Sequence, residues 1–90
     1  MTQAENQEQK RARYVSAVVV DEVLPSFPAG TGRVIVVTAP DGRTERQRHF
    51  KSLVEELQAQ SGLLAEHWPG TEWEYDFFNH RLVKFLKGPK

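Results

Sequence analysis

The most regular hydrophobic segment of the chain is Val34–Thr38, five β-branched residues in a row. Such side chains lose rotamer freedom in a helix and pack well on a pleated sheet, so the segment predicts a strand, which we extend to 33–39. The next residues read Ala-Pro-Asp-Gly, and proline followed two places later by glycine is typical of a tight turn. We therefore expect a β-hairpin in which Gly42 adopts a positive φ.

The second strand of this hairpin, Thr44–His49, is polar on both of its faces, whereas the first strand is apolar on both. The expected turn pairs Val36 with Arg46. A strand that is apolar on both faces is usually central in its sheet and covered above and below, and a charged strand usually lies at an edge. The first strand therefore needs a second neighbour from elsewhere in the chain.

The start of a helix follows the polar strand. Ser52–Glu55 fits a capping box, in which the Ser52 hydroxyl accepts a hydrogen bond from the amide of Glu55. The apolar residues of this segment fall on one helical stripe, and they are Leu53, Val54, Leu57, Leu64, Ala65 and Trp68. Gly62 lies within the stripe and either ends the helix or is tolerated in it at a cost of ~1 kcal/mol.

Three segments allow two readings each. The helix can instead begin at Thr44, but Arg46 would then oppose the helix dipole in the first turn, so we favour the later start. Ala12–Leu24 carries valines at helical spacing and stops before Pro25, yet its run of three valines also suits a strand; we favour the helix. Asn79–Lys87 is either a strand or a helix capped by its first residue, and we favour the strand.

Residues 71–77 alternate cleanly between apolar and polar side chains, which predicts a strand that pairs with residues 82–87. One face of this second hairpin carries Trp73, Tyr75 and Phe77, and the other carries Phe78, Leu82 and Leu86. Both of its faces are therefore apolar. A single helix cannot cover both, so a second helix or another chain is expected to cover one of them.

Together these elements predict one small α+β domain over residues 12–90, preceded by a polar flexible tail, residues 1–11. An N-terminal helix leads into a core with the order strand, strand, helix, strand, strand, in a mixed or antiparallel sheet with the helices packed on it. This order resembles the β-grasp arrangement, in which the first and last strands lie side by side at the centre of the sheet. That arrangement would supply the missing neighbour of the strand 33–39.

The chain has 90 residues, with 12 lysine and arginine residues against 12 aspartate and glutamate residues. This balance argues against a protein built mainly to bind nucleic acid or acidic membranes. The absence of cysteine excludes disulfide frameworks, thiolate catalysis and cysteine-ligated metal centres, and it fits a reducing, cytoplasmic location. No apolar run approaches ~20 residues, so we expect no membrane span.

The sequence offers little further chemistry. His49, His67 and His80 are far apart, whereas a zinc site needs about four convergent ligands, often at short spacings. The serines lie in no nucleophile motif, and the glycine-containing loop before residue 33 leads into a strand rather than the helix that a phosphate-binding loop requires. We therefore expect no catalytic residue, metal, cofactor or small-molecule substrate, and we interpret the chain as non-enzymatic.

Aromatic residues near the C-terminus support the first functional hypothesis. They are Trp73, Tyr75, Phe77, Phe78 and Phe85. Core packing is the ordinary role of such residues, but protein interfaces are enriched in the same types, and a hairpin that is apolar on both faces needs a second cover. We therefore predict a small protein-interaction module, either a homodimer or a subunit or regulator of a larger assembly.

A basic stretch around the polar strand supports the alternative hypothesis, a nucleic-acid-binding domain. Its residues are Arg33, Arg43, Arg46, Arg48, His49 and Lys51. Alternation places Arg46 and Arg48 on one face of the edge strand, in a position to contact phosphates. The ordinary role of such charges is to keep an edge strand from pairing with other chains, and Phe50 alone is available there for base stacking.

Overall fold

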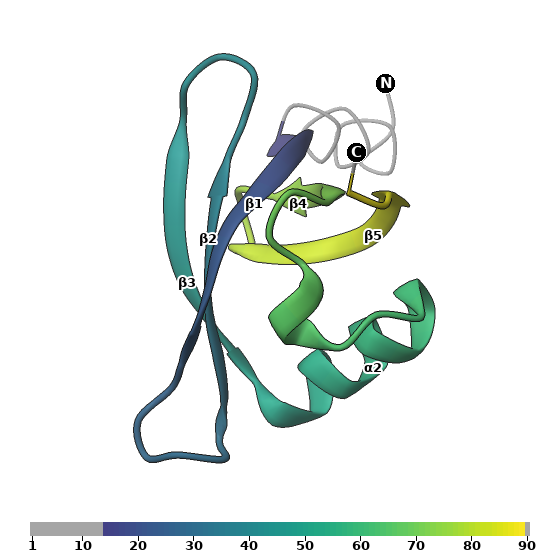
Figure 1. Ribbon diagram of the computed structural model, residues 1–90. Coiled ribbons are helices and arrows are strands. Elements are labelled where there is room, and N and C mark those ends of the chain that lie inside the picture. The colour runs from purple at the N-terminus through teal and green to yellow at the C-terminus, as the bar shows by residue number, and fades with distance from the viewer. Residues whose placement is uncertain (1–13, 90) are drawn as a thin grey trace, which may run out of the picture.

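The computed structural model describes residues 14–89, which form a five-stranded antiparallel sheet with one α-helix packed against it (Figure 1). In chain order the elements are β1 (Val15–Pro25), β2 (Gly32–Thr38), β3 (Thr44–Phe50), α2 (Lys51–Ser61), the 3-10 helix η1 (Ala65–His67), β4 (Glu72–Asp76) and β5 (Arg81–Lys87). The order across the sheet is β3-β2-β1-β4-β5. The α+β class is therefore confirmed, and the predicted tail, residues 1–11, lies outside the described residues.

The central strand β1 pairs with two different neighbours along its length. Its first part, Val15–Val19, pairs with β4, and the part from Val19 to Pro25 pairs with β2. A β-bulge at Asp21 interrupts the second pairing, and a bulge bends its strand and increases the local twist. One strand therefore joins both hairpins, and in Figure 1 β4 and β5 run across the direction of β2 and β3.

The helix predicted over Ala12–Leu24 is wrong for residues 15–24, which are extended; residues 12 and 13 lie outside the described part of the chain. Val18 and Val20 are 2% and 0% exposed, whereas Val19 between them is 41% exposed. The valines therefore alternate between the two faces of a central strand, a position that suits β-branched residues. The β-grasp-like order is also wrong, because β2 has β1 as its second neighbour and the last strand lies at an edge.

The hairpin of β2 and β3 is confirmed with the predicted register, and β3 is an edge strand. Val36 lies opposite Arg46, and the amide of Ala39 donates to the carbonyl of Arg43 at 2.8 Å. Gly42 has φ +94°, the left-handed conformation that the turn requires. The competing helix that starts at Thr44 is wrong, because residues 44–50 are paired with β2 along their whole length.

Helix α2 begins directly after β3, so the predicted capping box is wrong. Phe50 is the N-cap residue and its side chain makes no capping hydrogen bond, which leaves Ser52 inside the first turn. The amide of Lys51 instead donates to the carbonyl of Thr31 in the β1–β2 loop at 3.0 Å. The helix ends at Gly62, which has φ +73° and whose amide donates to the carbonyl of Gln58.

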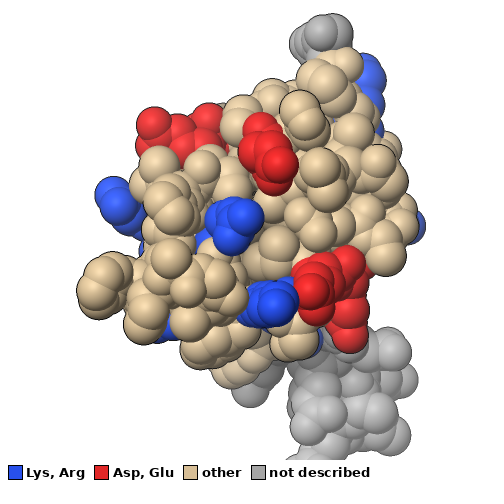
Figure 2. Space-filling view, turned by 60° about the horizontal axis from the view of Figure 1, so that its bottom comes forward, with Lys and Arg blue, Asp and Glu red and all other residues tan. Residues whose placement is uncertain are grey.

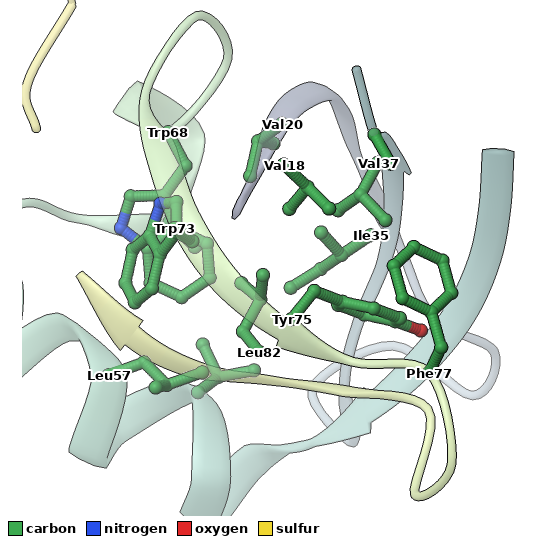
Figure 3. Packing of buried hydrophobic residues seen from close by; sticks show 13 residues of the cluster. Val18, Val20, Ile35, Val37, Leu57, Trp68, Trp73, Tyr75, Phe77 and Leu82 are labelled. Carbon is green, nitrogen blue, oxygen red and sulfur yellow. The ribbon is translucent and has the colours of Figure 1, made fainter. Parts of the chain in front are cut away.

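The core lies between the helix and one face of the sheet, which we call the inner face (Figure 3). Its fully buried side chains include Val18, Val20, Ile35, Val37, Trp73, Tyr75 and Leu82 from the strands, and α2 and η1 add Val54, Leu57, Ala65 and neighbouring Trp68. The rings of Trp68 and Trp73 are 5.0 Å apart. Their indole N–H groups donate to the Leu63 carbonyl and the Thr71 hydroxyl, so neither polar group is buried without a partner.

The hairpin of β4 and β5 is confirmed, but its two faces differ from the prediction. Irregularities in the pairing place Phe85 opposite Trp73 and Leu82 opposite Tyr75. Leu82 is therefore 1% exposed and packs on the inner face with the aromatic residues, rather than on the opposite face. Leu82 and Phe85 of β5 therefore pack with Trp73 and Tyr75 of β4 in or against the core.

Two glycines make the β2–β3 hairpin sensitive to substitution. At Gly42 an added Cβ would meet open space, so Gly42→Ala should cost about 1 kcal/mol from the positive φ alone. At Gly32, which has φ +141°, an added Cβ would overlap the carbonyl oxygen of His49. Gly32→Ala should therefore cost more, on the order of 3 kcal/mol, because the backbone has to move. Urea unfolding measures both, and equal costs would contradict the described hairpin.

Candidate functional site

Side-chain hydrogen bonds, rather than backbone pairing, join the edge strand β3 to β4 and β5. The Nε2 atom of His49 accepts from the amide of Leu82 at 3.0 Å. One carboxylate oxygen of Glu45 accepts from the hydroxyl of Tyr75 at 2.8 Å and lies 2.9 Å from the Nδ1 atom of His80. We call these contacts the seam, and they hold the crossed halves of the sheet around the core.

Two polar groups of the seam, the His49 imidazole and the Tyr75 phenol, are each held in the neutral form. His49 is 1% exposed, and its Nδ1 atom lies 3.1 Å from the carbonyl of Gln47, so the ring is neutral with its proton on Nδ1 and a free acceptor at Nε2. Burial lowers the pKa of His49, the bond to Gln47 partly offsets this, and the charge of Arg81 lowers it further. Burial also raises the pKa of Tyr75, and its bond to Glu45 raises it again, which keeps the phenol a donor.

A groove of about 430 Å³ opens beside the seam, between β3, the start of α2 and the β4–β5 turn. Its charged side chains are Arg48, Arg81 and Glu56, with His49 and His80 nearby. Charges of both signs and an open mouth suit a polar ligand. Among residues 14–89, however, no group of three or more His, Cys, Asp or Glu could hold a metal ion, and no buried polar side-chain atom lacks a partner.

The face of β1, β2 and β3 that points away from the core forms the second candidate surface, which we call the outer face. Cross-strand partners define its rows, because directly opposed residues share a face. Glu22, Val36 and Arg46 form one row. Leu24, Val34 and Arg48 form the next. The outer face therefore has an apolar middle on β2, with an acid on the β1 side and two bases on the β3 side.

The exposed aromatic ring of Phe50 lies at one end of the outer face. Phe50 is 63% exposed and lies in the row of Gly32, beyond the row of Arg48. The Arg48 guanidinium is 5.1 Å from the centre of this ring and also donates to the Thr31 hydroxyl at 2.9 Å. A cation above an exposed ring next to apolar residues offers both polar and apolar contacts to a binding partner.

The aromatic residues proposed for protein interaction lie mostly in the core rather than on one surface. Trp73 and Tyr75 are 0% exposed and Phe77 is 9% exposed, while Phe85 packs against the core and is partly buried. Phe78 is 66% exposed, and its ring lies 5.4 Å from that of Tyr14. Of the five residues, Phe78 alone is largely accessible to a partner.

The basic residues proposed for nucleic-acid binding are also spread over several environments. Arg46 and Arg48 share the outer face, as their alternation predicts. Arg43 pairs with Asp41 at 2.7 Å and lies 4.1 Å from the centre of the Phe77 ring. The remaining three are dispersed: His49 is buried, Arg33 lies opposite it in the inner-face row, and exposed Lys51 begins α2.

The distribution of charge is mixed on the surface seen in Figure 2. Lys and Arg side chains form small separate groups there, with Asp and Glu between them, and uncharged residues make up most of the view. Within the described residues, no helix is long and apolar enough to cross a membrane. The surface seen in Figure 2 therefore carries no single dominant charge that would attract a polyanion.

The sequence reading missed the β1 side of the outer face. Glu22 and Leu24 lie within Ala12–Leu24, the segment predicted as a helix, and residues of a helix would not pair with β2. The alternation of apolar residues before Val20 was the available signal. No pattern in the sequence predicted the bulge at Asp21, although this bulge determines which of the later residues of β1 point to the outer face.

The neutral state of His49 predicts how stability depends on pH. Because burial holds the folded pKa below the ordinary 6.5, the unfolded chain takes up a proton that the folded chain resists as the pH falls below 6.5. Stability is then full above that pH and is lost below it, by at most about 1.4 kcal/mol per pH unit. His49→Gln keeps an acceptor for Leu82 and should flatten the slope, measured by urea unfolding across the pH range.

The exposed residue His67 provides the matched control. His67→Gln should leave the slope unchanged. The account of the seam is contradicted if His49→Gln keeps the full slope, or if His67→Gln removes as much of it.

Comparison with known proteins found no family model, no curated protein and no solved structure that matches this chain. Function therefore has to be inferred from the geometry and charge of its own surfaces. The outer face and the groove beside the seam are the two surfaces with enough chemistry to support a proposal.

Proposed function

We propose that this chain is a small, cytoplasmic, non-enzymatic protein-interaction module that docks a protein partner on its outer face. The single observation behind the proposal is that β2 is apolar on both faces, although within residues 14–89 a helix packs over only one of them and the outer valines, Val34 and Val36, are half-buried. Ile35 and Val37 point into the core, and Val34 and Val36 point the other way. A half-solvated antiparallel sheet normally places polar residues on its open face.

The covering elements all lie on the inner side of the sheet. Helix α2 contributes Val54 and Leu57 to the core, and η1 with the residue after it contributes Ala65 and Trp68. Figure 1 has α2 on one side of the crossed strands, with β2 and β3 reaching past it. Within residues 14–89 no helix is packed over Val34 and Val36, so these half-buried valines would gain further apolar contacts from a partner that binds there.

The composition of the outer face fits a protein partner better than a small molecule. Its middle is apolar and its flanks are charged, which is the usual layout of a protein interface with an apolar core and a polar rim. Arginine and aromatic residues, here Arg46, Arg48 and Phe50, are also the types that most often dominate interface energies. Among the pockets described for residues 14–89, none is lined by Val34 or Val36, whereas small ligands prefer enclosed apolar pockets.

A site-specific cross-link tests the docking proposal. A photo-reactive residue in place of Thr44, which is exposed at the rim of the outer face, should form a discrete protein adduct in the source cell. The same residue in place of Glu55, exposed on α2, is the control and should not form it. Adding Arg46→Glu to the Thr44 variant should remove the adduct. Equal adducts at both positions, or an adduct that Arg46→Glu leaves intact, would contradict docking on this face.

Nucleic-acid binding is a second candidate, favoured by the position of Arg46, Arg48 and Phe50 on one face. Partly open five-stranded barrels are known that bind oligonucleotides on the face of their second and third strands, a likeness of layout that carries no function by itself. This candidate predicts that single-stranded DNA or RNA binds at low salt and is released as salt rises. A titration without binding at low salt, or without salt dependence, contradicts it.

A further inference from the structure

We propose that the partner is a second copy of this chain, docked outer face to outer face about a two-fold axis that runs parallel to β2. The inference rests on the proposed function, because it names the protein that covers the outer face. It would make the homodimer the active form of the module. The evidence is the order of charge and apolar surface across the three strands.

The charges of the outer face are complementary to themselves. Glu22 and Arg46 lie in the same row on either side of β2. Neighbouring strands are about 4.8 Å apart, so these two residues are separated by roughly 10 Å and do not meet within one copy. Among residues 14–89, neither takes part in an ion pair. Each is therefore free to pair with a charge brought from outside.

A two-fold axis parallel to β2 brings the right charges together. Such an axis exchanges the β1 and β3 sides and keeps each row at its own height. Glu22 of one copy then faces Arg46 of the second copy, and the pair occurs twice because a two-fold interface repeats every contact. An axis perpendicular to the strands would instead place β1 over β1 and β3 over β3, with acid near acid and base near base, which is unfavourable.

The same axis matches the apolar groups. Val34 and Val36 of one copy lie over the corresponding valines of the second copy, which gives β2 the second cover that it lacks. Leu24 meets the aliphatic stem of Arg48, since long basic side chains pack their methylene groups on apolar surface. Phe50 approaches the β1–β2 loop of the second copy, where Phe27 is 91% exposed.

Charge exchange between two variants tests this arrangement. Sedimentation velocity of the wild-type protein should detect a dimer at micromolar to submillimolar concentration. Glu22→Arg alone and Arg46→Glu alone should each weaken the dimer by about tenfold or more, because like charges then meet twice. A one-to-one mixture of the two variants should dimerise again, since the introduced arginine of one copy meets the introduced glutamate of the other.

Controls separate loss of the contact from loss of the fold. Both substituted residues are exposed, so thermal melts of the two variants at equal concentration should remain cooperative. Glu55→Arg on α2 introduces the same change of charge away from the outer face and should leave the dimer intact. A monomeric wild type, single variants that dimerise normally, or a mixture that stays monomeric would each overturn the proposal.

The two proposals fail in distinguishable ways. A monomeric wild type whose Thr44 cross-link is still removed by Arg46→Glu would refute the second copy and keep the docking face for a different protein. A wild-type dimer that is unaffected by either charge reversal, together with a Thr44 cross-link that Arg46→Glu leaves intact, would refute both proposals. Binding of single-stranded nucleic acid by a monomer, lost in Arg46→Glu, would support the second candidate function instead.

Discussion

The structure depends on the double pairing of β1. This strand pairs with β4 over its first half and with β2 over its second, and the bulge at Asp21 bends it within the second half. The two hairpins that share this strand cross (Figure 1), Trp73 lies beside Trp68, and the polar edge of β3 comes within hydrogen-bonding distance of β5.

Crossing the hairpins creates two surfaces with different roles. On the inner side, His49 of the seam and Gln60 of α2 accept from the β5 amides of Leu82 and Phe85, so the edge of β5 offers fewer free donors for pairing with other chains. On the outer side no helix packs over β2 within residues 14–89, and Val34 and Val36 are only half-buried. A small domain buries a modest fraction of its surface, and a partner on the outer face would add the contacts that one helix on one face cannot supply.

Local patterns predicted the local structures well. The β-branched run before Pro40 and the glycine after it were enough to predict the first hairpin and its register, because turn geometry fixes the pairing. The helix at Ala12–Leu24 failed because valines at helical spacing also fit a central strand, and pairing with β4 on one edge and β2 on the other decided between them. The capping box failed because β3 runs into α2 without a loop. The five aromatic residues do not share one accessible surface, because Trp73 and Tyr75 pack in the core while Phe78 is exposed.

The central claim is that the outer face of β2 is covered by another copy of the protein. Methyl NMR of valine-labelled protein, followed on dilution from submillimolar to micromolar concentration, tests it most directly. The claim predicts that the methyl signals of Val34 and Val36 shift with concentration, while those of Val18 and Val20 in the core stay fixed. Signals of Val34 and Val36 that do not move over that range would contradict it.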